Sequence, residues 1–226
     1  MPDTNERETG MIHASPLPNH LTDRYRSWKR HNFNNRSHYY ETLAAEGQHP
    51  REMIISCCDS RVHVTQMFQA DSGEMFIHRN VAALVPPYEA DNEHHGTSAA
   101  VEYAVRVLKV ERLIVLGHSN CGGVEGCYDM CEGSAPDLLD QESFIGRWID
   151  LLRPGYERLP EHGSRAERLT LLEKEGVLVS LENLMTFPWL AQAVEDESLS
   201  VIGLWTDIAA GSLEWWSPRE KAFVAI

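Results

Sequence analysis

Long hydrophobic runs are missing from this sequence of 226 residues. The longest apolar stretches, such as Leu113–Leu116 and Val177–Val179, are far shorter than the roughly 20 residues that a membrane-spanning helix needs. The first 16 residues mix charged and polar side chains and lack the apolar segment of a secretory signal. We therefore expect a flexible N-terminal arm over residues 1–22, no membrane contact and a cytoplasmic location.

Positive charge is also scarce. Lys and Arg together number 20, against 34 Asp and Glu, which gives a formal net charge of -14 at pH 7. Binding to the phosphates of a nucleic acid depends on clustered Lys and Arg side chains. The sequence therefore predicts no nucleic-acid partner.

Cysteines are few and odd in number. The five cysteines stand at positions 57, 58, 121, 127 and 131. An odd set in a chain without an export signal argues against a disulfide framework, so metal or thiol chemistry has to be considered first. No Cys-x-x-Cys pair occurs, which disfavours a structural zinc ribbon.

Short apolar runs alternate with helical patterns along the centre of the chain. Strands are expected over 52–58, 74–78 and 112–117, and helices over 97–108, 143–152 and 169–185. Unbroken apolar strands joined through helices are typical of a parallel sheet whose two faces are covered. The sequence therefore predicts an α/β fold with a mainly parallel central β-sheet flanked by helices.

The end of the chain adds two more strand patterns. Residues 198–206 and 213–216 are separated by a turn around Ala210 and Gly211. We expect about four parallel strands in all, plus an antiparallel C-terminal strand. The expected domain, 23–226, then consists of N-terminal helices (23–46), an α/β core (47–197) and C-terminal strands (198–226).

Two reactive clusters follow directly after predicted strands. Cys57, Cys58 and Asp59 follow the first strand, and His118 and Cys121 follow the third. Sites in open parallel sheets form beyond the carboxyl ends of the strands, so these side chains are expected to meet. Two thiolates and one imidazole suit a zinc ion with an open fourth position. Spacing alone does not decide between Cys57 and Cys58 as the first ligand.

Several separated motifs occur together in one order. They are Gly47-Gln48-x-Pro50, Cys57-x-Asp59-Ser60-Arg61, Phe76-x-x-Arg79-Asn80, Ser98-x-x-x-Glu102-Tyr103-Ala104, Gly117-His118-x-x-Cys121-Gly122-Gly123 and Asp207-Ile208-x-x-Gly211. This set resembles the beta-class carbonic anhydrases, in their plant-like branch, from about Tyr25 to the end. The resemblance implies a lyase that reversibly hydrates carbon dioxide by zinc-hydroxide attack.

The resemblance also implies which residues hold the metal. Cys57, rather than Cys58, would be a zinc ligand together with His118 and Cys121, with one zinc ion per chain. Asp59 and Arg61 would form a catalytic dyad in which the guanidinium keeps the carboxylate ionised. In a closed state, Asp59 would instead bind the zinc as a fourth ligand.

The implied substrate pocket lies outside these clusters. It would consist of Gln48, Phe76 and Tyr103 together with the backbone amide of Gly122. Ile54 stands where the bicarbonate-regulated bacterial branch has Trp, so regulation by bicarbonate is not expected.

The resemblance further implies a homo-oligomer, either a dimer or a dimer of dimers, in which the N-terminal helical arm packs on a partner subunit. Carbon dioxide and bicarbonate would be the small-molecule partners. Three alternatives stay open from the sequence: a hydrolase of carbonyl sulfide or carbon disulfide, a non-catalytic zinc-binding module, and a thiol redox protein using Cys57 and Cys58.

Overall fold

A computed structural model describes residues 14–89, 95–140 and 142–226. The chain divides into two compact units, Met1–Gly47 and Gln48–Ile226, and each is described by itself. The division falls one residue from the expected boundary between the N-terminal helices (23–46) and the core. Residues 1–13 of the expected arm lie outside the described residues.

The first unit is helical. It contains α1 (Asn19–Trp28), a π-helical segment η1 (Lys29–Phe33), a 3₁₀ turn η2 (Asn34–Arg36) and α2 (Ser37–Glu46). The first helix thus begins inside the range 1–22 that the sequence predicts as an arm. Aromatic rings of this unit contact one another, for example Phe33 and Tyr40 with centroids 5.1 Å apart. No described residue of these helices is buried within the unit, and their packing on a partner stays a prediction.

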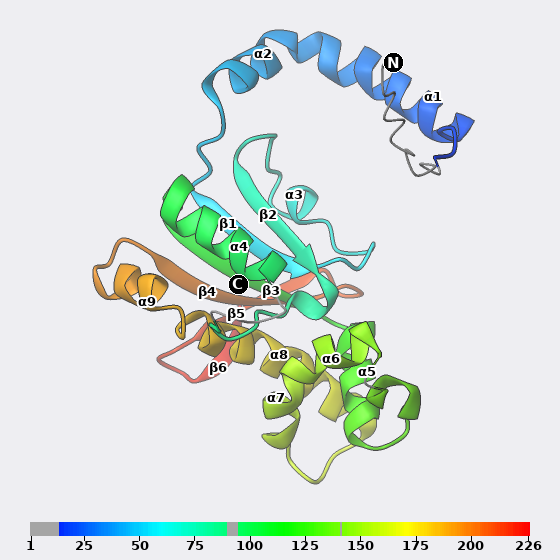
Figure 1. The fold of residues 1–226 in the computed structure, drawn as a ribbon, viewed down its shortest axis with the longest axis vertical. Coiled ribbons are helices and arrows are strands. Elements are labelled where there is room, and N and C mark those ends of the chain that lie inside the picture. Colours follow the sequence, from blue (N-terminus) through cyan, green and yellow to red (C-terminus); the bar gives the residue numbers. More distant parts are fainter. Residues whose placement is uncertain (1–13, 90–94, 141) are drawn as a thin grey trace, which may run out of the picture. The chain divides into compact units, whose positions relative to one another are not determined.

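The second unit is built on one sheet (Figure 1). In the described residues its strands are β1 (Glu52–Cys57), β2 (Met75–Asn80), β3 (Arg112–His118), β4 (Ser200–Asp207), β5 (Ser212–Ser217) and β6 (Ala222–Ala225). The strand order is β2-β1-β3-β4-β5-β6, with the first four parallel and the last two antiparallel. The predicted fold class, a mainly parallel sheet with an antiparallel C-terminal addition, is confirmed.

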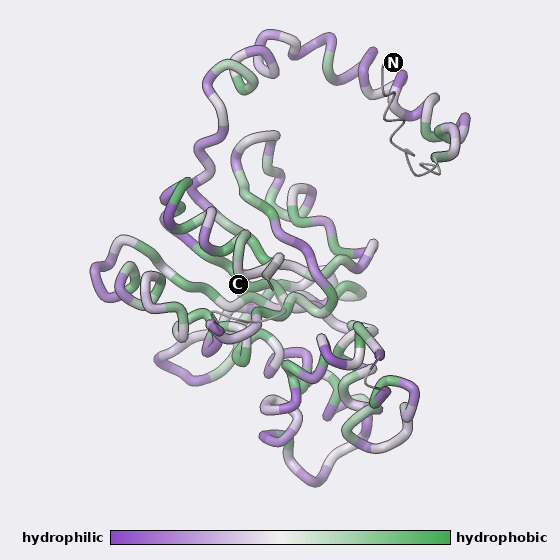
Figure 2. Tube along the Cα trace, viewed as in Figure 1, coloured by the Kyte–Doolittle hydropathy of each residue, from purple (hydrophilic) through white to green (hydrophobic). Residues whose placement is uncertain are grey.

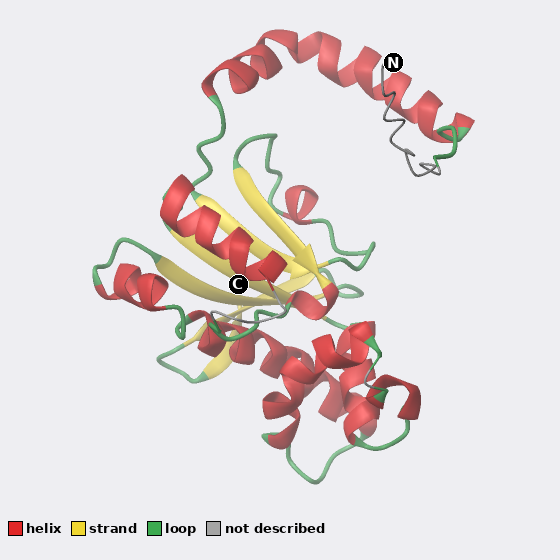
Figure 3. Cartoon of the chain, viewed as in Figure 1, coloured by secondary structure: helices red, strands yellow, loops and turns green. Residues whose placement is uncertain are grey.

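Helices connect the strands (Figure 3). They are α3 (Val64–Met67), η3 (Val81–Ala83), α4 (His95–Glu102), η4 (Tyr103–Leu108), α5 (Gly122–Cys131), η5 (Pro136–Leu139), α6 (Phe144–Ile149), η6 (Asp150–Leu152), α7 (Arg153–Glu157), α8 (Arg165–Leu184) and α9 (Pro188–Glu195). The helix expected over 169–185 begins earlier, because Ser164 and Glu167 form a capping box at its start.

The two faces of the sheet are covered differently. Side chains alternate along a strand, so Met53 and Ile55 of β1 point to one face and Ile54 to the other. The first face packs against α4, η4, α8 and α9, which contribute apolar residues such as Val101, Val105, Val177 and Leu190. The second face packs against Val62 and Val64 at the start of α3. Figure 2 shows the hydrophobic strands at the centre of this unit.

The direction of the chain connections reverses between β1 and β3. The chain leaves β1 towards β2 on one side, then returns past β1 to form β3 on its other side. Connections that leave two neighbouring parallel strands in opposite directions leave a gap at their carboxyl ends, where ligands bind in open α/β sheets. Cys57 and His118 are the last residues of these two strands.

Within the described residues, no single helix is long and apolar enough to span a membrane. The pair α8 and α9 meets that test of length and composition only when taken together, and it bends by 93° at its break.

Candidate metal centre

Three predicted donors meet at the carboxyl ends of β1 and β3. Cys57 ends β1, His118 ends β3, and Cys121 stands immediately before α5. Their donor atoms all lie within 4.8 Å of one another, and the two sulfur atoms are 4.0 Å apart. The residues are 5%, 2% and 3% exposed, whereas the neighbouring Cys58 is exposed. The structure therefore brings together Cys57, and not Cys58, with the other two.

The imidazole of His118 is oriented by its own backbone neighbour. Its Nδ1 lies 2.9 Å from the carbonyl oxygen of Ser119. A carbonyl can only accept a hydrogen bond, so Nδ1 carries the proton and Nε2 keeps its lone pair. That Nε2 is buried and has no hydrogen-bond partner. An imidazole that is oriented through Nδ1 and has a free lone pair on Nε2 next to two thiols is suited to bind a metal ion.

The two thiols fit a divalent cation. Hydrogen bonding from Cys121 lowers the pKa of Cys57 to about 4, and the same hydrogen bond raises the pKa of Cys121. The pair therefore loses one proton readily and the second with difficulty, and a cation would compensate for the second negative charge. Two sulfurs bound at about 2.3 Å to a tetrahedral zinc would lie about 3.8 Å apart, close to the observed separation.

The turn from His118 to Cys121 is held in place at several points. The backbone N–H of Ser119 donates to the carbonyl of Thr206 at 2.9 Å, and the Ser119 hydroxyl accepts from the N–H of Ile208 at 2.9 Å. Asn120 has a φ of 55°, in the left-handed region that non-glycine residues seldom adopt. These hydrogen bonds fix a turn that the backbone would not favour by itself.

Asp59 and Arg61 form the expected pair. The Arg61 side chain donates from Nε to Oδ1 at 3.0 Å and from Nη2 to Oδ2 at 2.7 Å, and its backbone N–H donates to Oδ1 at 2.9 Å. These hydrogen bonds hold the pKa of Asp59 far below its usual range. Arg61 also donates to the carbonyl of Asn120 at 2.8 Å, which ties the dyad to the metal turn.

Arg79 has a role that the sequence did not reveal. Its side chain donates to three backbone carbonyls, those of Cys57 at 2.9 Å, Asp59 at 2.7 Å and Val62 at 2.9 Å. It thereby clamps the loop that follows β1. The available signal was a charged residue near the end of a strand that begins with three apolar residues, but its partners depend on the strand register.

The predicted substrate residues lie elsewhere in the chain. Phe76 pairs with Met53 in the register of β1 and β2, whereas Cys57 pairs with Asn80. Four residues along a strand separate Phe76 from the metal end by about 13 Å. Tyr103 contacts Phe76, with ring centroids 5.8 Å apart, and Gln48 precedes β1. Only Gly122, the first residue of α5, lies next to a metal-site residue.

Comparisons with known proteins agree with this geometry. A family model described as carbonic anhydrase matches residues 52–213. Beta carbonic anhydrase 3 of Arabidopsis thaliana is 34% identical over 192 residues, covering 84% of this chain and 72% of that protein. The structure of the beta-carbonic anhydrase CcaA matches with a TM-score of 0.80 and 28% identity, covering 92% of this chain and 91% of the other. A tetrameric beta-carbonic anhydrase of Sordaria macrospora matches with a TM-score of 0.71 and 27% identity, covering 87% and 94%.

The fold, the cysteine and histidine cluster and these matches define the class of the protein as a carbonate dehydratase, which is a lyase. The chain belongs to the carbonic anhydrase family, and within it to the beta class. The resemblance drawn from the motifs is thereby confirmed.

The adjacent cysteines at 57 and 58 allow a matched test of the metal site. After loading with zinc and removal of excess metal, the wild type and Cys58→Ser are expected to retain about one zinc ion per chain. Cys57→Ser is expected to retain less than about a tenth of that amount, because it removes a buried donor. Metal analysis of the three proteins checks this. Loss of zinc from Cys58→Ser, or full retention by Cys57→Ser, would contradict the assignment.

Proposed function

We propose that the chain reversibly hydrates carbon dioxide to bicarbonate and a proton, with one zinc ion held by Cys57, His118 and Cys121. The observation that supports this best is the buried convergence of two thiols and an imidazole whose Nε2 has no other partner. Zinc held there would supply Lewis acidity, lowering the pKa of a water molecule towards roughly 7 so that it can attack carbon dioxide.

Asp59 is suited to orient that water. Its backbone N–H lies 3.4 Å from the sulfur of Cys57, and its carboxylate is linked through Arg61 to Asn120 of the metal turn. An ionised carboxylate accepts a hydrogen bond from the water and aims the oxygen lone pair at the substrate. Because Arg61 engages both carboxylate oxygens, we propose the open state of the site rather than the closed state with Asp59 as fourth ligand.

The amide of Gly122 offers a place for a bicarbonate oxygen. Gly122 begins α5, and unpaired N–H groups at a helix N-terminus attract negative charge. A Cβ added to Gly122 would meet no atom within 4 Å, so there is space for a small anion beside it. This fits the predicted role of Gly122.

A second copy of the chain is the proposed source of Gln48, Phe76 and Tyr103. In its own chain, Phe76 stands about 13 Å along the strand from the metal end. Tyr103 is 43% exposed and Gln48 is also exposed, so both are accessible to another molecule. The tetrameric Sordaria macrospora relative supports assembly into a homo-oligomer. The cytoplasmic location and the lack of a nucleic-acid partner stay predictions from the sequence.

Stopped-flow hydration assays test the reaction. Zinc-loaded wild type is expected to hydrate carbon dioxide, and removal of zinc by a chelator should abolish the activity. Measured in protein saturated with zinc, Arg61→Gln should lower kcat/KM at least about tenfold, because Asp59 would lose its orientation. Arg153→Gln, which breaks an exposed pair with Asp150, is the matched control and should leave activity unchanged. Zinc-loaded wild type without activity would contradict the proposed function.

Complementation between two impaired variants tests the shared site. Cys57→Ala and Gln48→Ala are each expected to be impaired as homo-oligomers. A mixed dimer, purified through two different tags, would contain one site with an intact metal centre and an intact partner Gln48, and one site with both defects. Its activity should reach about half of the wild-type value per dimer, since a symmetric interface builds each site from both chains. A mixed dimer no more active than its parents would show that Gln48 acts within its own chain.

A further inference from the structure

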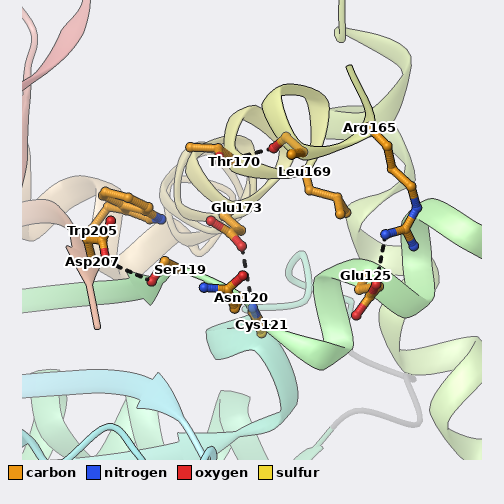
Figure 4. A pocket seen from close by; sticks show the side chains of 11 residues that line it. Ser119, Asn120, Cys121, Glu125, Arg165, Leu169, Thr170, Glu173, Trp205 and Asp207 are labelled. Atoms are coloured by element: carbon orange, nitrogen blue, oxygen red, sulfur yellow. Dashed lines mark hydrogen bonds and ion pairs between the residues drawn. The ribbon is translucent and has the colours of Figure 1, made fainter. Parts of the chain in front are cut away.

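A buried acid lies behind the metal turn. Among the residues that the structure describes, Glu173 of α8 is the only buried Asp or Glu, with 6% of its surface exposed. Its Oε1 accepts a hydrogen bond from the backbone N–H of Cys121 at 3.4 Å. Figure 4 shows Glu173 beside Asn120 and Cys121. A side chain distant in sequence thus touches the backbone of a proposed zinc ligand.

Folding stability does not account for this carboxyl group. Its second oxygen, Oε2, is buried and has no hydrogen-bond partner. The indole nitrogen of Trp205 is likewise unpartnered and lies on the side of its ring that faces Glu173 (Figure 4). Burying a carboxyl group costs free energy, and an apolar side chain would avoid that cost only by leaving the amide of Cys121 without its acceptor. This cost of burying the carboxyl group is explained if Glu173 supports the metal centre.

A cavity borders the turn from His118 to Cys121 on the side where Glu173 lies. A cavity of about 510 Å³ lies between α8, the start of α5 and the end of β4, and both Cys121 and Glu173 line it. On this side of the turn, Glu173 supplies the acceptor for the amide of Cys121. Arg61 holds the turn from another element, through the carbonyl of Asn120. The two side chains therefore fix consecutive residues of the turn.

We propose that Glu173 is a positioning residue for the metal centre: its carboxyl oxygen holds the amide of Cys121 and thereby sets the place of the Cys121 sulfur. This inference rests on the proposed zinc binding. It assigns Glu173 the role of a hydrogen-bond acceptor that acts through Cys121 and does not touch the substrate.

Glu175 provides a matched control. It lies on the same helix two residues further along and is also partly buried, with an Oε2 that ion-pairs with Nε of Arg158 at 2.9 Å. Its side chain is 22% exposed and is absent from the lining of the cavity beside Cys121. Substitution of Glu175 therefore reports the general effect of removing a helix carboxylate without touching the turn.

The experiment measures zinc affinity by competition with a chromophoric chelator, for wild type, Glu173→Gln, Glu173→Met and Glu175→Met. Glutamine keeps an acceptor oxygen, so Glu173→Gln should bind zinc within about threefold of wild type. Methionine has a similar length and no oxygen, so Glu173→Met should bind about 10–100-fold more weakly, as is usual when a group that orients a ligand is lost. Glu175→Met should match wild type. The cobalt-loaded Glu173→Met protein should also show altered thiolate-to-metal absorption bands.

A purely structural role would lower the melting temperature of the metal-free protein and leave zinc affinity unchanged at temperatures where that protein is folded. Because the amide of Cys121 loses its acceptor, we expect metal-free Glu173→Met to melt somewhat below the wild type. Below that melting temperature it should still bind zinc more weakly than the wild type. If this variant does not fold, Glu173→Leu replaces it. Wild-type affinity in the apolar variant would overturn the inference, and so would equal losses in Glu173→Gln and the apolar variant. Failure of the wild type itself to bind zinc would instead contradict the proposed function.

Discussion

The parallel pairing of β1 with β3 is the constraint on which the site depends. The buried residues Met53–Ser56 align with Leu113–Leu116, and this register brings Cys57 level with the end of β3. Burial of both strands makes a shift of register costly, because it would move the apolar side chains to the wrong face. Core packing therefore brings Cys57 to His118 and Cys121, which lie more than 60 residues further along the sequence.

Polar contacts then fix the orientation of the side chains that this register brings together. Arg79 holds the loop after β1, Ser119 orients the imidazole of His118, and Arg61 links Asp59 to the turn at Asn120. Each contact ends on a backbone group or on a side chain beside the donors, so the donor atoms are fixed before a metal ion arrives. Preorganisation of this kind raises metal affinity, and the pairing of Asp59 with Arg61 is the basis for the proposed open state.

Much of this could be predicted from the sequence. Apolar runs bounded by reactive residues indicated the parallel strands, and the family resemblance favoured Cys57 over Cys58 as the ligand. The short strand β6 was missed, because its four residues, which follow the turn at Ser217–Glu220, show no clear alternation of apolar and polar side chains. Arg79 was noted only as part of a motif and Glu173 was not singled out, because their partners are backbone groups of distant segments. The distance of Phe76 from the metal-site end of the sheet depends on the register between β1 and β2, and hydrophobic periodicity alone does not determine that register.

The most direct measurement of the central claim is a crystal structure of the zinc-loaded protein with anomalous diffraction recorded at the zinc edge. We expect one zinc ion per chain, about 2.3 Å from the sulfur atoms of Cys57 and Cys121 and about 2.0–2.1 Å from Nε2 of His118, with Asp59 paired to Arg61. Zinc bound through Cys58 or through Nδ1 of His118, or coordination by Asp59 with Arg61 released, would contradict it.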